Sequence, residues 1–249
     1  MHSIAIIGSE GRMGRALREY ITGTDDIRSA LELGSSDSME QLLQSGVDCV
    51  VDLSNGEGVD THGTAVVNAG LPYVIGATGY ALETVERMQA ISAERGSPVL
   101  IVPNFSIGAN LMILFARQAA RYMQAPVVTE RHHDRKADAP SGTARYTAAG
   151  IAEVLAGQPG SAKSSTAEDY TEQLKGVLGG NQDMVAIHSI RGAGYLAEQQ
   201  VLFSLQGESL AVEHRSIDRS CFMPGIAWCV RNIHRVEGLV VGMDRIMEL

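Results

Sequence analysis

The stretch IAIIGSEGRMGRAL, Ile4–Leu17, decides the fold. Its apolar start, Ile4–Ile7, predicts a buried strand. The residues after the third glycine, Gly14, belong to a predicted helix. Three glycines between strand and helix permit a tight turn, and they let backbone N–H groups approach a pyrophosphate at the helix start. The strand–turn–helix context is the one that a dinucleotide-binding turn requires, whereas a plain turn without a ligand is the alternative.

Beyond this turn, short apolar runs alternate with helical stretches over roughly the first hundred residues. This alternation predicts crossover units, and therefore a parallel sheet with helices on its faces. The expected strands are Ile4–Ile7, a second strand that ends near Leu31-Glu32, then Cys49–Leu53, Tyr73–Ile75 and Val99–Val102. The expected helices are Arg12–Thr22, Met39–Gln44, Gly58–Ala69 and Leu82–Glu94.

The pattern changes after residue 105, where strands follow one another with few helices between them. Helices are expected at Ala109–Met123, Ser141–Leu155 and Phe222–Val230, a surface loop at Gly157–Ser165, and strands at Val127–Glu130, Val185–Ile190, Ala197–Leu205 and Ser209–Ser216. Such a half favours a mixed or antiparallel sheet. We therefore predict an α/β protein. A Rossmann-like parallel-sheet domain would comprise residues 1–105 and about 217–249, and an α+β domain with a mixed sheet would comprise about 106–216.

Composition excludes several classes of function. The 249 residues carry a net charge of −9, which disfavours a nucleic-acid partner. No apolar stretch approaches the roughly 20 residues that span a bilayer, and the N-terminus lacks the basic lead of a secretory signal. The three cysteines are an odd number without metal-type spacing, so they are interpreted as small buried residues. We expect a cytoplasmic protein with no membrane partner and no metal.

An acidic residue should follow the glycine turn by about 20 positions and bind the adenosine ribose of a dinucleotide. Glu32 fits this spacing, and Leu33 stands next to it, where an arginine would favour a 2′-phosphate. We therefore expect NADH or NADPH as cofactor, with NADH preferred, although Arg15 and Arg28 are near enough in sequence to reach a 2′-phosphate. Glu10 lies inside the turn, and we expect its carboxylate to point outward.

Two further loops follow predicted strands. They are Gly76–Gly79, with the sequence GATG, and Pro103–Ser106, with the sequence PNFS. In an open parallel sheet, ligands bind beyond the carboxyl ends of the strands, so both loops are expected to border the nicotinamide. Ordinary turn chemistry is the alternative, since the same residue types serve it equally well.

The second informative segment is ERHHDRKADAPSGTA, residues Glu130–Ala144. It places two histidines, two arginines and a lysine within six residues of an acidic chain, and a Ser-Gly-Thr that opens a helix follows. A helix start can bind a carboxylate, and a histidine can donate a proton. Reduction of a C=N or C=C bond in an anionic substrate needs both, together with a hydride donor. A solvated charged turn is the alternative; a metal site lacks a complete ligand set.

At this point the chain resembles a known family. GSEGRMG, GATG, PNFSIGAN and ERHHDRKADAPSGTA occur in the order typical of the 4-hydroxy-tetrahydrodipicolinate reductases, also called dihydrodipicolinate reductases, of the diaminopimelate–lysine pathway. HSIRGAG, AEQQVLF, HRSIDRSCF and PGIAWCVRNI extend the resemblance over nearly the whole chain. It implies NAD(P)H-dependent reduction of 4-hydroxy-tetrahydrodipicolinate to tetrahydrodipicolinate with loss of water. It also implies a small anionic dicarboxylate as substrate and a homotetramer built through the sheet of the second domain.

The resemblance further implies roles for single residues. His132 resembles the proton donor of the family, Lys136 resembles its second catalytic residue, and His133 resembles its substrate-binding histidine. Substrate binding also extends to Ser141, Gly142 and Thr143 at the helix start. The implied cofactor contacts are Gly8, Ser9, Glu10, Gly11, Arg12, Met13, Glu32, Gly76, Ala77, Thr78, Val102, Pro103, Asn104 and Phe105. Arg191 resembles an arginine near the active site; the resemblance gives no role to Arg131 or Arg135.

Four positions depart from the family pattern: Leu33, Leu53, Ala77 and Gln199. They affect cofactor preference and fine positioning, and they remove no catalytic group. Two rival functions remain. Another Rossmann oxidoreductase, such as an amino-acid dehydrogenase, would lack the DAPSGTA helix start. A non-catalytic nucleotide-sensing protein would have no use for His132 and Lys136.

Overall fold

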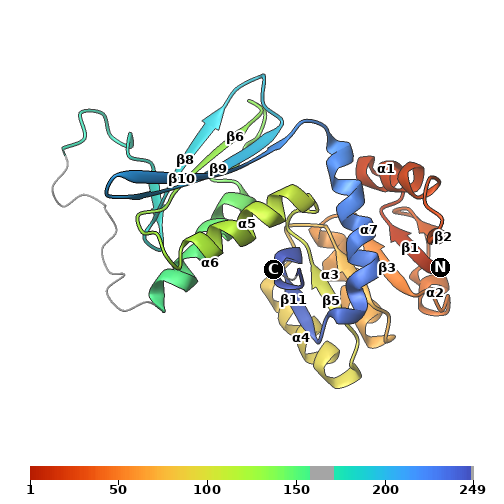
Figure 1. The fold of residues 1–249 in the computed structure, drawn as a ribbon. Helices are drawn as coiled ribbons and strands as arrows, with labels where there is room; N and C mark the ends of the chain where they lie inside the picture. Colours follow the sequence, from red (N-terminus) through yellow and green to blue (C-terminus); the bar gives the residue numbers. More distant parts are fainter. Residues whose placement is uncertain (158–170, 248–249) are drawn as a thin grey trace. The chain divides into compact units, whose positions relative to one another are not determined.

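The computed structural model describes residues 1–157 and 171–247, so the predicted loop Gly157–Ser165 lies outside the described residues beyond its first position. The chain forms two compact units. Unit 1 is Met1–Ser106 together with the chain from Ser220 onward, and unit 2 is Ile107–Arg219. Each unit has its own β-sheet (Figure 1). Among the described residues, no helix has the length and apolar content to cross a membrane.

Unit 1 is built on a six-stranded, all-parallel sheet with the order β11-β5-β4-β3-β1-β2. Its strands are β1 (His2–Ile7), β2 (Ile27–Leu33), β3 (Cys49–Asp52), β4 (Tyr73–Ile75), β5 (Val99–Ile101) and β11 (Leu239–Val241). Its helices are α1 (Arg12–Ile21), α2 (Met39–Leu43), α3 (Gly56–Asn68), α4 (Leu82–Arg95) and α7 (Met223–Asn232), followed by short 3₁₀ turns.

Both faces of this sheet are covered. Successive residues of a strand point to opposite faces, and the neighbours Val50 and Val51 on β3 are both fully buried. Helix α1 packs beside α7, and α3 packs beside α4 (Figure 1). Burial on both faces explains why the strands are continuous apolar runs rather than alternating ones.

The carboxyl ends of the central strands are joined by backbone hydrogen bonds from the residues just beyond them. The pattern is the same at each step, because the first residue after one strand donates to the last residue of its neighbour. The bonds are Gly8 N to Leu33 O at 2.8 Å, Leu53 N to Ile7 O at 2.9 Å, Gly76 N to Asp52 O at 2.8 Å, and Val102 N to Ile75 O at 2.8 Å. All the loops that follow these strands are therefore brought to one edge of the sheet, where a parallel sheet binds its ligands.

Unit 2 contains a five-stranded mixed sheet with the order β10-β9-β6-β8-β7. Its elements are α5 (Ile107–Ala119), β6 (Val127–His132), α6 (Gly142–Ala156), β7 (Gly180–Gln182), β8 (Val185–Arg191), β9 (Ala197–Leu205) and β10 (Glu208–Ser216). The central strand β6 runs parallel to β8 and antiparallel to β9. Helices α5 and α6 pack together, and α6 packs against the sheet, where Val128, Ile151 and Val201 are fully buried.

The predicted fold class is confirmed: a Rossmann-like parallel sheet and a second, mixed sheet. Two strands, β7 and β11, were not predicted. The sequence of β7, GNQ, carries no apolar residue that would signal a strand. Strand β6 runs two residues beyond the predicted end at Glu130 and includes His132. Helix α3 begins at Gly56 rather than Gly58, since the Asn55 side chain accepts a hydrogen bond from Gly58 N and caps it.

Candidate active site

Steric crowding requires the glycines of the turn after β1. Gly8 has a φ of +78°, and a Cβ on it would lie 2.8 Å from the backbone carbon of Leu53. A Cβ on Gly14 would lie only 2.3 Å from the carbonyl oxygen of Gly8. Backbone atoms cannot give way as a flexible side chain can, so both positions need glycine. The sequence thus encodes a close-packed turn between β1 and α1.

The start of α1 fits an anionic group. Gly11 stands at the N-cap without any side-chain cap, and no acidic residue occupies the first turn. The first-turn N–H groups therefore have no capping acceptor from a side chain, which is the condition for binding a phosphate there. The N–H groups of Gly8 and Ser9, by contrast, both donate to the Leu33 carbonyl. The residues present fit the pyrophosphate of a dinucleotide, with the helix start as the anion site.

A pocket of about 760 Å³ opens beside this turn, at the carboxyl ends of β1, β2 and β3. We call it the glycine-turn pocket; its lining includes Gly8, Gly11, Leu33, Leu53 and His62. Of the predicted cofactor contacts, Gly8, Glu10 and Gly11 line it. Glu10, whose carboxylate was expected to point outward, is one of these lining residues. Its side chain is exposed, but its carboxylate lies over Gly34 along the pocket wall.

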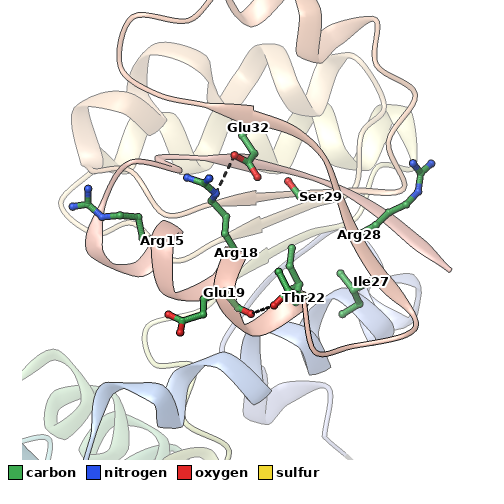
Figure 2. A pocket seen from close by; sticks show the side chains of 9 residues that line it. Arg15, Arg18, Glu19, Thr22, Ile27, Arg28, Ser29 and Glu32 are labelled. Carbon is green, nitrogen blue, oxygen red and sulfur yellow. Dashed lines mark hydrogen bonds and ion pairs between the residues drawn. The ribbon is translucent and has the colours of Figure 1, made fainter.

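Glu32 takes a different position. Its carboxylate forms an ion pair with Arg18 Nε at 3.0 Å. Glu32 also lines a separate pocket of about 660 Å³, together with Arg15 and Ser29 (Figure 2). Leu33, the next residue on β2, lines the glycine-turn pocket. Because strand side chains alternate between faces, Glu32 and Leu33 serve opposite faces of the sheet. The structure therefore does not bring Glu32 together with the glycine turn.

The two loops after β4 and β5 do meet. A Cβ on Gly76 would lie 2.3 Å from the ring of Phe105, so the aromatic ring packs directly over this glycine. Ala77 is buried, Thr78 and Pro103 are exposed, and the Asn104 side chain accepts a hydrogen bond from Ser106 N at 2.9 Å. The two segments predicted to border the nicotinamide are thus neighbours at the carboxyl edge of the sheet.

A buried polar network lies under the glycine-turn pocket. The Asp52 carboxylate at the end of β3 is fully buried and bonded to His62 Nε2 at 2.6 Å, to the Tyr73 hydroxyl and to Ser54. Burial would raise the pKa of Asp52, but the hydrogen bonds from His62, Ser54 and Tyr73 hold it below its ordinary value. The sequence analysis missed this network, because His62 lies ten residues away on a helix.

In unit 2, the predicted proton donor is a strand residue. His132 ends β6, and its Nδ1 is hydrogen-bonded to the carboxylate of Glu130, two residues earlier on the same face. The Glu130 side chain is fully buried, and that of His132 is 15% exposed. Glu130 therefore fixes the ring through Nδ1 and leaves Nε2 as the nitrogen that can serve a substrate.

Glu130 also binds Arg191, the last residue of β8. The two guanidinium nitrogens donate to its two oxygens at 3.0 and 2.9 Å, and Nη2 also donates to the carbonyl of Asp138 at 2.7 Å. Burial would raise the pKa of Glu130, but hydrogen bonds from His132, Arg191 and Ser189 lower it to about 2. Glu130 is thus a permanent anion that joins the strand end to the loop.

The rest of the loop is ordered around this pair. Lys136 Nζ pairs with both oxygens of Asp138, at 2.7 and 3.0 Å, and the Lys136 backbone N donates to the His133 carbonyl. Ser141 is the N-cap of α6, and its hydroxyl accepts from Ala144 N at 3.2 Å. The Ser141 hydroxyl therefore serves as the cap of the helix. Gly142, the first residue of α6, is exposed, so the helix start is accessible at this residue. Thr143, the next predicted substrate contact, is half-buried.

Arg131 belongs to the opposite face of the sheet. It lies between Glu130 and His132 on β6, and it pairs with Glu198 at 3.3 Å and Glu213 at 3.0 Å. Arg131 therefore belongs to an ion-pair network that joins β6, β9 and β10. Arg135 is exposed. Among residues 1–157 and 171–247, no group of three or more His, Cys, Asp or Glu side chains is placed to hold a metal ion.

Glu130 is the residue of this candidate site that the sequence analysis missed. It was included only as the start of the basic segment, with the strand expected to end there. The two-residue spacing from His132 was the available signal, since positions i and i+2 of a strand share a face. The signal is informative only if β6 continues through His132. Arg131 and His132 are both polar, so the sequence did not indicate that the strand continues.

A glycine-turn parallel-sheet unit and a mixed-sheet unit with a buried Glu–His pair and a lysine loop define a two-unit, Rossmann-type NAD(P)H-dependent reductase. The family model "Dihydrodipicolinate reductase, N-terminus" matches residues 2–105, and "Dihydrodipicolinate reductase, C-terminus" matches residues 108–247. The chain belongs to the dihydrodipicolinate reductase family.

Known proteins similar to this chain agree in length as well as sequence. It is 36% identical over 247 residues to a 4-hydroxy-tetrahydrodipicolinate reductase of Mycolicibacterium smegmatis, with 99% of each chain covered. It is 38% identical to that of Nocardia farcinica, covering 99% of this chain and 98% of the relative. The structure of a dipicolinate-bound dihydrodipicolinate reductase from Paenisporosarcina sp. TG-14 matches with a TM-score of 0.85 and 28% identity, over 99% of this chain and 100% of that one.

Proposed function

We propose that this chain reduces 4-hydroxy-tetrahydrodipicolinate to tetrahydrodipicolinate, with loss of water, in the diaminopimelate–lysine pathway. The observation that carries the proposal is the Glu130–His132 pair at the end of β6, beside the α6 helix start, in a chain that matches 4-hydroxy-tetrahydrodipicolinate reductases over its full length. The solved relative is described as dipicolinate-bound, which supports a small planar dicarboxylate as the ligand of this family.

His132 is assigned to proton delivery. The buried carboxylate of Glu130 accepts a hydrogen bond from Nδ1–H and fixes the ring, so that Nε2 can deliver a proton to the substrate after hydride transfer. The bound nicotinamide supplies the hydride. Glu130 itself does not touch the substrate in this assignment; it positions the ring. Arg191 holds Glu130 in place by its two parallel hydrogen bonds.

Lys136 and the start of α6 are assigned to the substrate carboxylates, with His133 beside them. Lys136 now pairs with Asp138, whose side chain is 61% exposed. Exposed ion pairs contribute little, about 0–1 kcal/mol, so a substrate carboxylate can replace Asp138 on Lys136 at small cost. Gly142 and Thr143 complete the carboxylate seat through the helix start, while Ser141 maintains that start as its cap.

In unit 1, the predicted cofactor contacts around the glycine turn and after β4 and β5 are assigned to the dinucleotide. We propose NADH as the preferred cofactor over NADPH, because Leu33 rather than a basic residue follows Glu32 and lines the glycine-turn pocket. Arg15 and Arg28 line the other pocket (Figure 2).

We also propose a homotetramer in the cytoplasm. Support for the assembly comes from the sheet face of unit 2 opposite to Glu130, where Val127, Ile190 and Leu202 line a groove of about 810 Å³. Apolar side chains in an exposed groove are typical of an interface. Light scattering coupled to size-exclusion chromatography gives the mass directly; a monomer of 26.6 kDa would contradict the assembly.

The decisive experiment is a spectroscopic assay at the nicotinamide absorbance. The purified protein is mixed with NADH and the product of the preceding synthase reaction, and separately with NADH, ammonia and a generic 2-keto acid. We expect NADH oxidation in the first mixture only. Oxidation in the second mixture alone would identify an amino-acid dehydrogenase instead, and NADH binding without oxidation in either would identify a sensor.

A further inference from the structure

Two pockets of unit 1 flank the end of β2, and they differ in charge. The glycine-turn pocket is lined by three acidic residues, Glu10, Asp37 and Glu57, and the described residues that line it include no lysine or arginine. The pocket around Glu32 contains three arginines, at positions 15, 18 and 28 (Figure 2). An adenosine ribose would therefore lie beside acidic residues in the glycine-turn pocket and beside arginines in the pocket around Glu32.

The glycine turn determines that side. Gly8 and Gly11, which open the way to the α1 helix start, line the glycine-turn pocket and do not line the pocket around Glu32. A pyrophosphate at the helix start thus leads into the glycine-turn pocket. Glu32 faces the other way and is already bound by Arg18 at 3.0 Å.

Glu10 is the carboxylate best placed in that pocket. A Cβ on Gly34 would lie 2.9 Å from its Oε2, so the carboxylate rests over the first residue after β2. Asp37 is committed to that turn, because it accepts a hydrogen bond from Gly34 N at 2.7 Å. Glu57 stands further along, in the first turn of α3. Among the described residues, no ion pair engages the Glu10 carboxylate, whose side chain is exposed.

We infer that Glu10, rather than Glu32, recognises the adenosine ribose of the dinucleotide and excludes a 2′-phosphate. The inference deepens the proposed function and rests on it for the identity of the cofactor. A carboxylate accepts hydrogen bonds from both ribose hydroxyls of NADH. The same carboxylate repels a 2′-phosphate, which carries about two negative charges, and the described lining supplies no cation to offset this repulsion.

The test uses two variants of Glu10 and one matched control. Glu10→Gln keeps the size of the side chain and removes its charge, Glu10→Lys reverses the charge, and Glu32→Gln removes the other acid. Binding of NADH and NADPH to each full-length protein is measured by isothermal titration calorimetry without substrate. This readout is independent of turnover, so it is separate from the test of the proposed reaction.

We expect Glu10→Gln to shift the NADPH-to-NADH affinity ratio by about tenfold towards NADPH, which corresponds to about 1.4 kcal/mol, and Glu10→Lys to shift it further. Glu32→Gln should leave the ratio within about twofold. A shift that appears in Glu32→Gln and not in the Glu10 variants would overturn the inference. If the Glu10 variants shift binding but the wild type reduces no 4-hydroxy-tetrahydrodipicolinate, the proposed function fails and the inference about Glu10 stands.

Discussion

The glycine turn of unit 1 and the basic loop of unit 2 are held in shape by opposite means. The turn is held by close backbone packing that leaves no room for side chains: a Cβ at Gly14 would lie 2.3 Å from a backbone oxygen. The loop is fixed by one added group, the buried carboxylate of Glu130, which binds His132, Arg191 and the backbone N of Ser141. Close packing holds the proposed cofactor site in shape, and a buried charge holds the proposed catalytic site in shape.

This difference determines what each site tolerates. A turn fixed by close packing fails when any side chain is added, whatever its polarity. A loop fixed by a buried charge fails when that charge is lost, even if the replacement has the same shape. The following predictions test this contrast, from the largest expected effect to the smallest.

Replacement of His132 should separate the two sites most strongly. We expect His132→Ala to lower kcat by about 10²–10⁴-fold, because the proton donor is lost, and to leave NADH affinity within about twofold. His133→Ala is the matched control, in which KM should rise more than kcat falls. Steady-state kinetics with calorimetric NADH titration measures both. A turnover of His132→Ala close to that of the wild type would contradict the assignment.

Glu130→Gln should expose the dependence of unit 2 on charge. It leaves the half-buried Arg191 guanidinium without its carboxylate, so we expect a loss of about 3 kcal/mol in the free energy of unfolding, and a lower kcat. Glu153→Gln removes the partner of Arg117 in an ion pair whose carboxylate is 58% exposed, and should cost less than about 1 kcal/mol. Urea unfolding compares the two. Equal losses would show that Glu130 is an ordinary ion-pair partner.

Gly14→Ala should expose the dependence of unit 1 on space. The added Cβ would meet the Gly8 carbonyl oxygen and lie 2.7 Å from Ser9 Cα, so we expect a loss of about 1–3 kcal/mol in unfolding free energy and weaker NADH binding. Gly23→Ala is the control, because its Cβ would meet only an ordinary contact at 3.6 Å. If dipicolinate binding fell as much as NADH binding, the defect would not be confined to the turn.

The smallest effect is a dependence of stability on pH. The folded-state pKa of Glu130, about 2, lies below its ordinary value of 4.5, so its contribution to stability is complete above pH 4.5 and is lost as the pH falls towards 2. The difference in unfolding free energy between wild type and Glu130→Gln should therefore shrink by about 1 kcal/mol between pH 7 and pH 4. A difference that stays constant over this range would mean that Glu130 is not held as an anion.

The same contrast explains what the sequence reveals. Constraints of space appear as glycines at fixed positions, and the turn from Gly8 to Gly14 was predicted with its strand and helix. Constraints of charge depend on which distant residues meet. The pairing of Glu130 with Arg191, 61 residues later, follows from the register of β6 with β8, and no local pattern encodes that register. The face on which Glu32 lies could not be predicted for a similar reason, since it depends on where β2 begins in the alternation of its side chains.

The chain path of unit 1 has a consequence for synthesis. Its sheet receives β11 from Leu239–Val241, whereas its other strands lie before residue 102, and all of unit 2 comes between them. A ribosome therefore completes the contiguous unit 2 while unit 1 still lacks α7 and the strand that covers the edge of β5. Until Leu239–Val241 emerge, β5 has an unpaired edge that is available to other chains. Unit 1 therefore begins before unit 2 and is completed after it.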